Sequence, residues 1–147
     1  MVGRSRGYLL AALFLAVAFL MLGQAQAQFV RTIEIKAVGL NDTTLNDENE
    51  ARACKKFRPT KRQLVRFFNR AQPPVDNAAL LHERYSSCAA EGSIRLTDGS
   101  FGRWVLFSSG VASITFDDGR IVDLFYRHNG WRDPYACTYG MSGEPEC

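Results

Sequence analysis

Four short apolar runs separated by glycine-containing turns fill residues 92–127 and constrain the fold more than any other stretch. The runs cover 93–96, 101–107, 111–116 and 121–126, and the turns between them cover 97–100, 108–110 and 117–120. Runs of this kind, rich in β-branched and aromatic residues and bounded by Gly, Asp and Ser, are typical of strands joined by hairpins. The stretch predicts a four-stranded antiparallel meander over about 93–127.

The last hairpin has two possible registers. A two-residue turn would place Ile114 opposite Asp123, whereas a three-residue loop over 117–119, with Gly119 in the left-handed conformation, places Ile114 opposite Val122. The second register is favoured because it puts apolar residues on one face of the sheet.

The second run is apolar on both sides. Trp104 and Leu106 alternate with Phe101, Val105 and Phe107, a pattern that favours an interior strand. One face would lie under a helix, and the other would be covered by the N-terminal arm, the C-terminal tail or a partner.

An amphipathic helix is predicted over about 60–72. Thr60 suits the N-cap position, and an apolar stripe follows it at helical spacing; Pro73 and Pro74 stop the helix. The stripe consists of Leu64, Phe67, Phe68 and Ala71. A helix on an antiparallel sheet gives the α+β class.

Arg62, Arg66 and Arg70 recur every four residues on the other side of this helix. Like charges at this spacing cost a few tenths of a kcal/mol per pair, and an anionic partner would relieve them. The candidates are an anionic lipid, an envelope polymer and an acidic protein. Alternatively, the row is simply solvated, or the acidic residues of 47–50 fold back onto it.

The N-terminus has the pattern of a signal peptide. Arg4 and Arg6 precede an uninterrupted apolar run over 9–22, and Ala25-Gln26-Ala27 follows as a cleavage site. An uncleaved anchor is the alternative, although the run is shorter than the roughly 20 residues that span a membrane. Losing residues 1–27 lowers the formal net charge from +3 to +1. This near-neutral balance, together with export, argues against nucleic acid as a partner.

Three segments are expected: the signal peptide over 1–27, an N-terminal arm and acidic linker over 28–53, and a single α+β domain over 54–147. Residues 29–35 alternate in polarity and suit a short strand or an ordered arm. A second short helix is expected over 76–83.

All four cysteines follow the predicted cleavage site, and an even number in an exported chain predicts two disulfides. Three connectivities are possible. Loop closure favours Cys54 with Cys88 and Cys137 with Cys147, because shorter loops close more readily. Neither a Cys-x-x-Cys motif nor a pair of neighbouring histidines is present, so no metal is expected.

Aromatic residues crowd a turn-rich segment over 128–140. His128, Trp131, Tyr135 and Tyr139 are therefore candidate binding residues, because loops at the end of a rigid sheet often carry function. In the alternative interpretation, Trp131 and Tyr135 cap one end of the core while Cys137 fixes the tail.

Catalysis has weak support in the sequence. His128 and Asp133 could orient one another, with Ser108 or Ser109 as the nucleophile of a small hydrolase, but no Gly-x-Ser-x-Gly motif accompanies them. No cofactor is expected. The sequence favours binding over catalysis.

Several spaced residues resemble a group of small exported bacterial proteins of uncharacterised function. They are Cys54-x-x-Phe57-x-Pro59-Thr60, Cys88-x-x-x-Gly92, Asp98-Gly99, Trp104, Gly110 and Asp133-Pro134-x-x-Cys137. The resemblance implies an exported α+β protein and assigns no residue a role. The residues predict an exported, non-enzymatic binding protein, periplasmic or secreted, such as an inhibitor or immunity-like factor for a protein partner. An envelope-surface module that uses the basic helix is an alternative.

Overall fold

The computed structural model describes residues 28–42, 47–76 and 83–139. The predicted signal peptide, residues 77–82 of the predicted second helix, and Cys147 lie outside these ranges. Among the residues that the structure describes, no helix has both the length and the hydropathy needed to cross a membrane.

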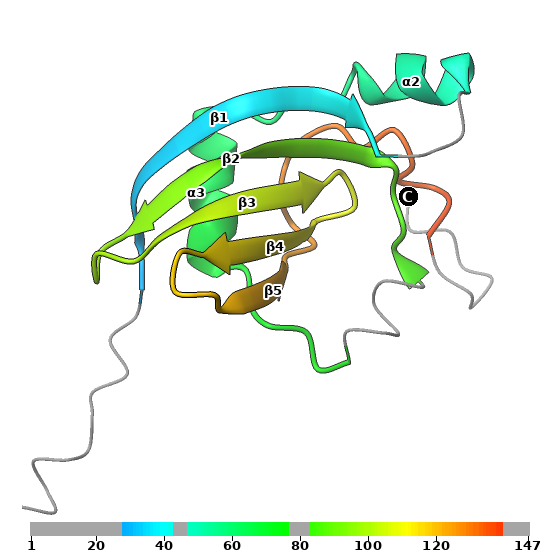
Figure 1. Cartoon of the computed structure of the whole chain (residues 1–147). Coiled ribbons are helices and arrows are strands. Elements are labelled where there is room, and N and C mark those ends of the chain that lie inside the picture. Colours follow the sequence, from blue (N-terminus) through cyan, green and yellow to red (C-terminus); the bar gives the residue numbers. More distant parts are fainter. Residues whose placement is uncertain (1–27, 43–46, 77–82, 140–147) are drawn as a thin grey trace, which may run out of the picture.

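A five-stranded antiparallel sheet, with its strands in chain order, forms the frame of the molecule. The strands are β1 (Val30–Asn41), β2 (Cys88–Leu96), β3 (Phe101–Phe107), β4 (Val111–Phe116) and β5 (Ile121–Phe125), and the helices are α2 (Glu48–Cys54) and α3 (Lys61–Arg70). Helix α3 crosses one face of the sheet and leaves most of the other uncovered (Figure 1). The α+β class and the antiparallel sheet are confirmed.

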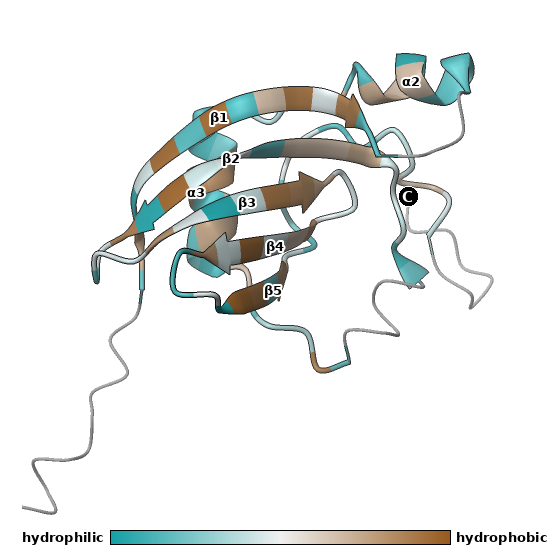
Figure 2. Cartoon of the chain, viewed as in Figure 1, coloured by the Kyte–Doolittle hydropathy of each residue, from teal (hydrophilic) through white to brown (hydrophobic). Residues whose placement is uncertain are grey.

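The prediction of four strands is wrong by one, because β1 pairs with β2 along its whole length, from Val30 opposite Leu96 to Asn41 opposite Cys88. Hydrophilic and hydrophobic residues alternate along the start of β1 (Figure 2). Register shifts between Ile35 and Ala37 and between Val38 and Leu40 then interrupt the alternation. A bulge reverses the face on which the following side chains lie, so the sequence pattern fades although the strand continues.

The three hairpin loops of the meander are built alike. Gly99, Gly110 and Gly119 each take the third loop position with a φ of 86° to 91°. This left-handed conformation costs glycine little and other residues more. Ile114 pairs with Val122, which confirms the three-residue loop and its register.

Helix α3 begins at a capping box. The Thr60 hydroxyl accepts a hydrogen bond from the Gln63 N–H at 3.3 Å, and the Gln63 side chain accepts one from the Thr60 N–H at 2.8 Å. The helix ends at Arg70 because Ala71 is extended and prolines follow at 73 and 74. The predicted helix is thus confirmed, with its end two residues earlier.

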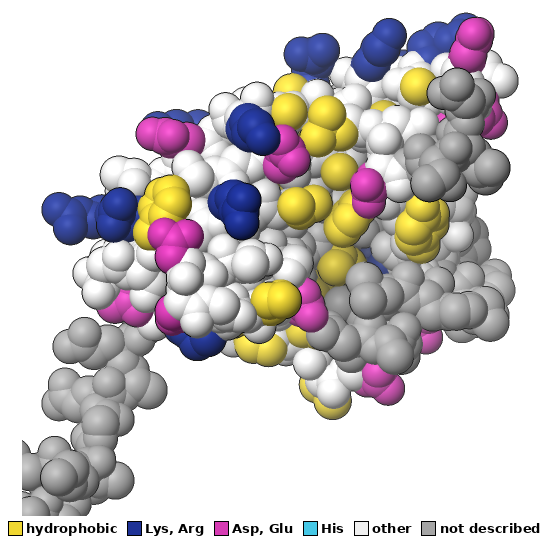
Figure 3. Space-filling view, viewed as in Figure 1, with side chains coloured by type: hydrophobic (Ala, Val, Ile, Leu, Met, Phe, Trp, Pro, Cys, Tyr) yellow, Lys and Arg dark blue, Asp and Glu magenta, His cyan; other side chains and the backbone are white. Residues whose placement is uncertain are grey.

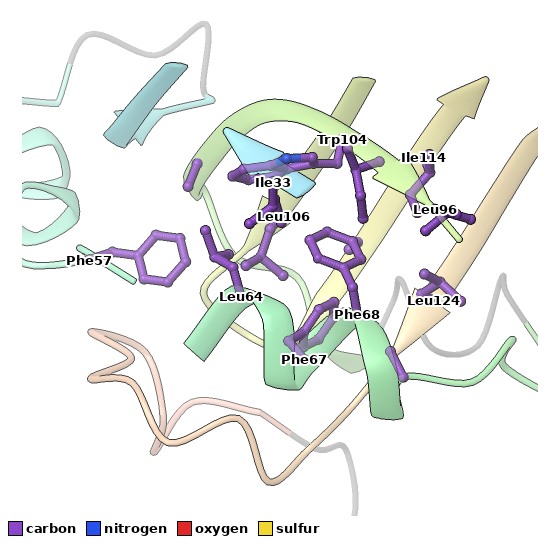
Figure 4. Packing of buried hydrophobic residues seen from close by; sticks show 14 of the residues in the cluster. Ile33, Phe57, Leu64, Phe67, Phe68, Leu96, Trp104, Leu106, Ile114 and Leu124 are labelled. Carbon is purple, nitrogen blue, oxygen red and sulfur yellow. The ribbon is translucent and has the colours of Figure 1, made fainter. Parts of the chain in front are cut away.

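The core lies between α3 and the sheet (Figure 4). Leu64, Phe67 and Phe68 of α3 are buried against the helix-facing side chains of β3, and the rings of Phe68 and Trp104 lie 5.7 Å apart. Trp104 is fully buried, and its indole N–H donates to the Ser93 carbonyl at 3.0 Å. β3 is the middle strand, so the predicted interior position is confirmed.

Gly92 makes room for this tryptophan. A Cβ at position 92 would lie 1.9 Å from the Glu34 carbonyl oxygen and 2.6 Å from the Trp104 ring. Only glycine lets β1 and the indole approach β2 so closely.

A disulfide joins Cys54, at the end of α2, to Cys88, at the start of β2, as loop closure predicted. Both cysteines are fully buried. Cys137 is disulfide-bonded as well, but its predicted partner, Cys147, lies outside the described residues. Helix α2 occupies part of the segment expected to be a linker, and Asp47 caps it by accepting a hydrogen bond from the Asn49 N–H at 2.8 Å.

Candidate functional site

The first candidate site is the solvent-facing side of α3. Arg62, Arg66 and Arg70 are all exposed, and the Arg70 guanidinium donates to the Tyr126 hydroxyl at 3.4 Å. The hydrogen bond from Arg70, and then that from Arg66, lower the pKa of Tyr126. We call these four residues the α3 basic surface.

No acidic side chain neutralises this surface in the described part of the chain. Residues 55–75 contain seven basic residues and no acid, and the ion pairs found elsewhere do not involve the three arginines. The basic residues are Lys55, Lys56, Arg58, Lys61, Arg62, Arg66 and Arg70. The surface therefore presents uncompensated positive charge to solvent.

Two of the acidic residues of 47–50 form hydrogen bonds away from α3. Asp47 caps α2, and the Glu50 carboxylate accepts hydrogen bonds from the Ser87 hydroxyl at 2.5 Å and the Tyr135 hydroxyl at 3.3 Å. These contacts hold Asp47 at the start of α2 and Glu50 beside Ser87 and Tyr135.

Two of the predicted tail residues contribute to the core. The Trp131 ring lies 5.8 Å from Phe57 and 5.4 Å from Phe67, and its indole N–H donates to the Ser108 carbonyl at 2.8 Å. The Tyr135 hydroxyl donates a hydrogen bond to the Glu50 carboxylate at 3.3 Å and so joins two parts of the chain that are 85 residues apart in the sequence. These contacts support the interpretation in which Trp131 and Tyr135 cap one end of the core.

The residues proposed for a hydrolase are only partly brought together. The Ser108 hydroxyl donates to the Asp133 carboxylate at 2.6 Å, and it also lies 2.6 Å from the Ser86 hydroxyl. Ser108 is fully buried, however. His128 is exposed and packs edge-on against Tyr126 at 6.1 Å. Within the described ranges no hydrogen bond joins His128 to Asp133 or Ser108.

A second candidate site is a hollow of about 260 Å³ beside the β3–β4 loop. Its lining includes four basic or acidic side chains and two hydroxyl groups; we call it the tail hollow. These residues are Arg84, Arg127, His128, Asp133, Ser109 and Tyr139. Burial, followed by the nearby Asp133, raises the pKa of Tyr139 well above its ordinary value.

The uncovered face of the sheet carries a larger hollow of about 740 Å³. Hydrophobic side chains gather across this face, with charged groups of both signs beside them (Figure 3). Val105 remains 38% exposed and Ile35 40% exposed. The predicted cover over this side of β3 is therefore incomplete among the described residues.

The structure adds residues that the sequence did not indicate. Tyr126 joins the α3 basic surface because it follows β5 directly and its ring lies 6.4 Å from that of Phe67 in α3. Arg84 and Arg127 reach the tail hollow from separate segments. The described residues contain no group of three or more His, Cys, Asp or Glu side chains placed to hold a metal ion.

Comparisons with protein families, curated proteins and solved structures find no match to this chain. The resemblance to exported bacterial proteins therefore stays a prediction.

Proposed function

We propose that this chain is an exported, non-enzymatic binding protein of the bacterial envelope or secreted space, which holds an acidic protein partner as an inhibitor or immunity-like factor does. The observation that carries this proposal is the α3 basic surface, whose arginines have no acidic counterpart among the described residues.

The chemistry of this surface suits carboxylates. A guanidinium presents its donors in a planar fork that matches a carboxylate, and Arg and Tyr are enriched among the residues that dominate binding energy at protein interfaces. Arg70 and Tyr126 already lie in contact, so part of the surface is ordered before a partner arrives. Less side-chain freedom is then lost on binding.

Export is supported by the cysteines. Disulfides persist in oxidising compartments, and the Cys54–Cys88 bond is buried inside the domain. The predicted signal peptide would deliver the chain to such a compartment.

The test compares two variants of equal net charge. One replaces Arg62, Arg66 and Arg70 with glutamine; the control replaces Arg31, Arg52 and Arg103, which are exposed elsewhere. Both are immobilised and exposed to extract from the envelope of the source cell at increasing salt. We expect the first variant to lose salt-sensitive capture of a defined acidic protein and the control to keep it. Equal capture by both variants would refute the proposal.

The same two variants test the envelope-surface alternative. Each arginine near an anionic bilayer contributes about 1 kcal/mol, so losing three would weaken binding to anionic vesicles by roughly 100-fold. Vesicle binding that depends on these arginines, without any captured protein, would favour the lipid partner. The hydrolase alternative is supported only by the contact between Ser108 and Asp133. It predicts a hydrolytic activity that His128→Ala removes.

A further inference from the structure

Gln28, which precedes β1, is held beside the β2–β3 hairpin through its side chain and through the next residue. The Phe29 N–H donates to the Thr97 hydroxyl at 3.2 Å, and the Thr97 N–H donates to the Phe29 carbonyl at 2.9 Å. The start of β1 therefore lies against this hairpin (Figure 1). The Gln28 side-chain amide donates from Nε2 to Oδ2 of Asp98 at 2.5 Å. A glutamine amide and a carboxylate are thus in contact where the chain enters the sheet.

Hydrogen bonds fix the Asp98 carboxylate in its charged form. Its Oδ1 accepts a hydrogen bond from the Ser100 N–H and its Oδ2 accepts one from the Ser100 hydroxyl, both at 2.9 Å. The bond from the Ser100 N–H, and then that from its hydroxyl, lower the pKa of Asp98, so the carboxylate is a base at neutral pH. A carboxylate within hydrogen-bond reach of a reacting atom can take a proton from one group and return it to another.

Gln28 also directly follows the predicted cleavage site, Ala25-Gln26-Ala27. Cleavage there frees the α-amine of Gln28 close to its own side-chain amide. The two groups belong to one residue, so attack of the amine on Cδ has the advantage of an intramolecular step and closes a lactam ring. The ring leaves the peptide bond between Gln28 and Phe29 intact, and β1 keeps its pairing.

We propose that Gln28, once freed by cleavage, cyclises to pyroglutamate with Asp98 as the general acid–base catalyst. The neutral α-amine attacks Cδ and forms the new N–Cδ bond, while the Asp98 carboxylate takes one proton from the attacking nitrogen. Asp98 then returns that proton to Nε2, the Cδ–Nε2 bond breaks, and ammonia leaves. Both nitrogens are bonded to Cδ in the intermediate, so a carboxylate in contact with one lies close to the other.

The product has lost the positive charge of the amino terminus. The proposal depends on the export in the proposed function, since only cleavage after Ala27 frees this amine. It does not depend on the α3 basic surface.

The test follows the mass of the mature chain, residues 28–147, because loss of ammonia lowers it by about 17 Da. The chain is released from an N-terminal fusion immediately before the measurement, so that Gln28 starts uncyclised. We expect the folded protein to cyclise about 100-fold faster than a free peptide of residues 28–34, the lower end of what general acid–base catalysis contributes. Asp98→Asn should fall to the peptide rate, since an amide of the same shape cannot carry the proton.

Asp118→Asn is the matched control, because Asp118 takes the same place in the β4–β5 hairpin and its Oδ1 accepts a hydrogen bond from the Arg120 N–H at 3.0 Å. It should cyclise at the native rate. The native sequence unfolded in urea should cyclise at the peptide rate, a comparison that needs no substitution. Equal rates in the folded protein, Asp98→Asn and the peptide would overturn the proposal. So would a folded protein slower than the peptide, because the Asp98 contact would then restrain the amide.

The chain that the source cell exports tests the cleavage separately. We expect it to begin at Gln28 and to be about 17 Da lighter than the uncyclised sequence. A chain that begins at Gln28 with its full mass, or that begins at another residue, would overturn the proposal without touching the binding function, which the α3 arginine variants test. A chain that stays in the cell with residues 1–27 attached would refute the export itself.

Discussion

Removing the Cys54–Cys88 disulfide should cost this domain a large part of its stability. The two cysteines are 34 residues apart in the sequence. In the chain-entropy description, opening a loop of that length stabilises the unfolded state by about 4 kcal/mol. Small domains are typically stable by only about 5–15 kcal/mol. The loop includes the whole of α3, so the helix regains its freedom in the unfolded chain.

The assay is urea unfolding of Cys54→Ala/Cys88→Ala against the oxidised protein, followed by the fluorescence of the two tryptophans. The expected loss of about 4 kcal/mol corresponds to a fall in Tm of about 15 °C for a domain of this size. A second comparison uses a variant that lacks Cys137 and Cys147 but keeps Cys54 and Cys88. Its oxidised and reduced forms should also differ by about 4 kcal/mol in the free energy of unfolding, and here no buried side chain at the disulfide has been shortened. A difference below about 1 kcal/mol in both comparisons would refute the loop-entropy argument.

Three further predictions concern single positions. In urea unfolding, Gly92→Ala should lower the free energy of unfolding by about 3 kcal/mol or more, because its Cβ would overlap the β1 backbone. Gly119→Ala has open space around it and should lower the free energy of unfolding by only about 1–2 kcal/mol, the strain of the left-handed conformation. Thr60→Ala should lower the free energy of unfolding by about 1 kcal/mol through loss of the α3 cap, and Thr60→Ser should restore it. The folded state raises the pKa of Tyr139 above its unfolded value, so the stability that the neutral phenol contributes is present below about pH 10 and lost above it. Urea midpoints of Tyr139→Phe should therefore fall less steeply than those of the native protein as the pH rises past about 10, and parallel curves would contradict this assignment.

Local chemistry made much of the meander and α3 predictable from the sequence. Gly119 fixed the register of the last hairpin because only a three-residue loop aligned the apolar faces, and Thr60 marked the start of α3 as a capping residue. Both signals depend on neighbours within a few residues. The predicted start of the first run, at residue 93, was wrong because β2 begins at Cys88. Cys88, Ala89 and Ala90 have no strong strand preference, and pairing with β1 holds them in the strand.

The candidate sites were less predictable because they depend on contacts across the sheet. The arginine row was visible in the sequence, but its link to Tyr126 spans 56 residues. The tail hollow brings Arg84 beside the β3–β4 loop and the C-terminal segment. These segments are far apart in the sequence, so no local helix or strand pattern could predict that they lie together. Helix α2 did have a local signal, since Asp47 and Glu50 flank its first turn as in a capping box, but the acidic composition favoured a linker.

The irregular pairing of β1 also bears on how the protein behaves at high concentration. A strand at the edge of a sheet offers unpaired backbone groups along which a second molecule can align and begin a fibre. Three register shifts within twelve residues bend β1, and Gly39, at φ 67°, lies against the backbone at the end of α2. No long, straight stretch of this edge is left with which a strand of another molecule could pair. The bulges that hid the strand from the sequence pattern thus guard the domain against aggregation.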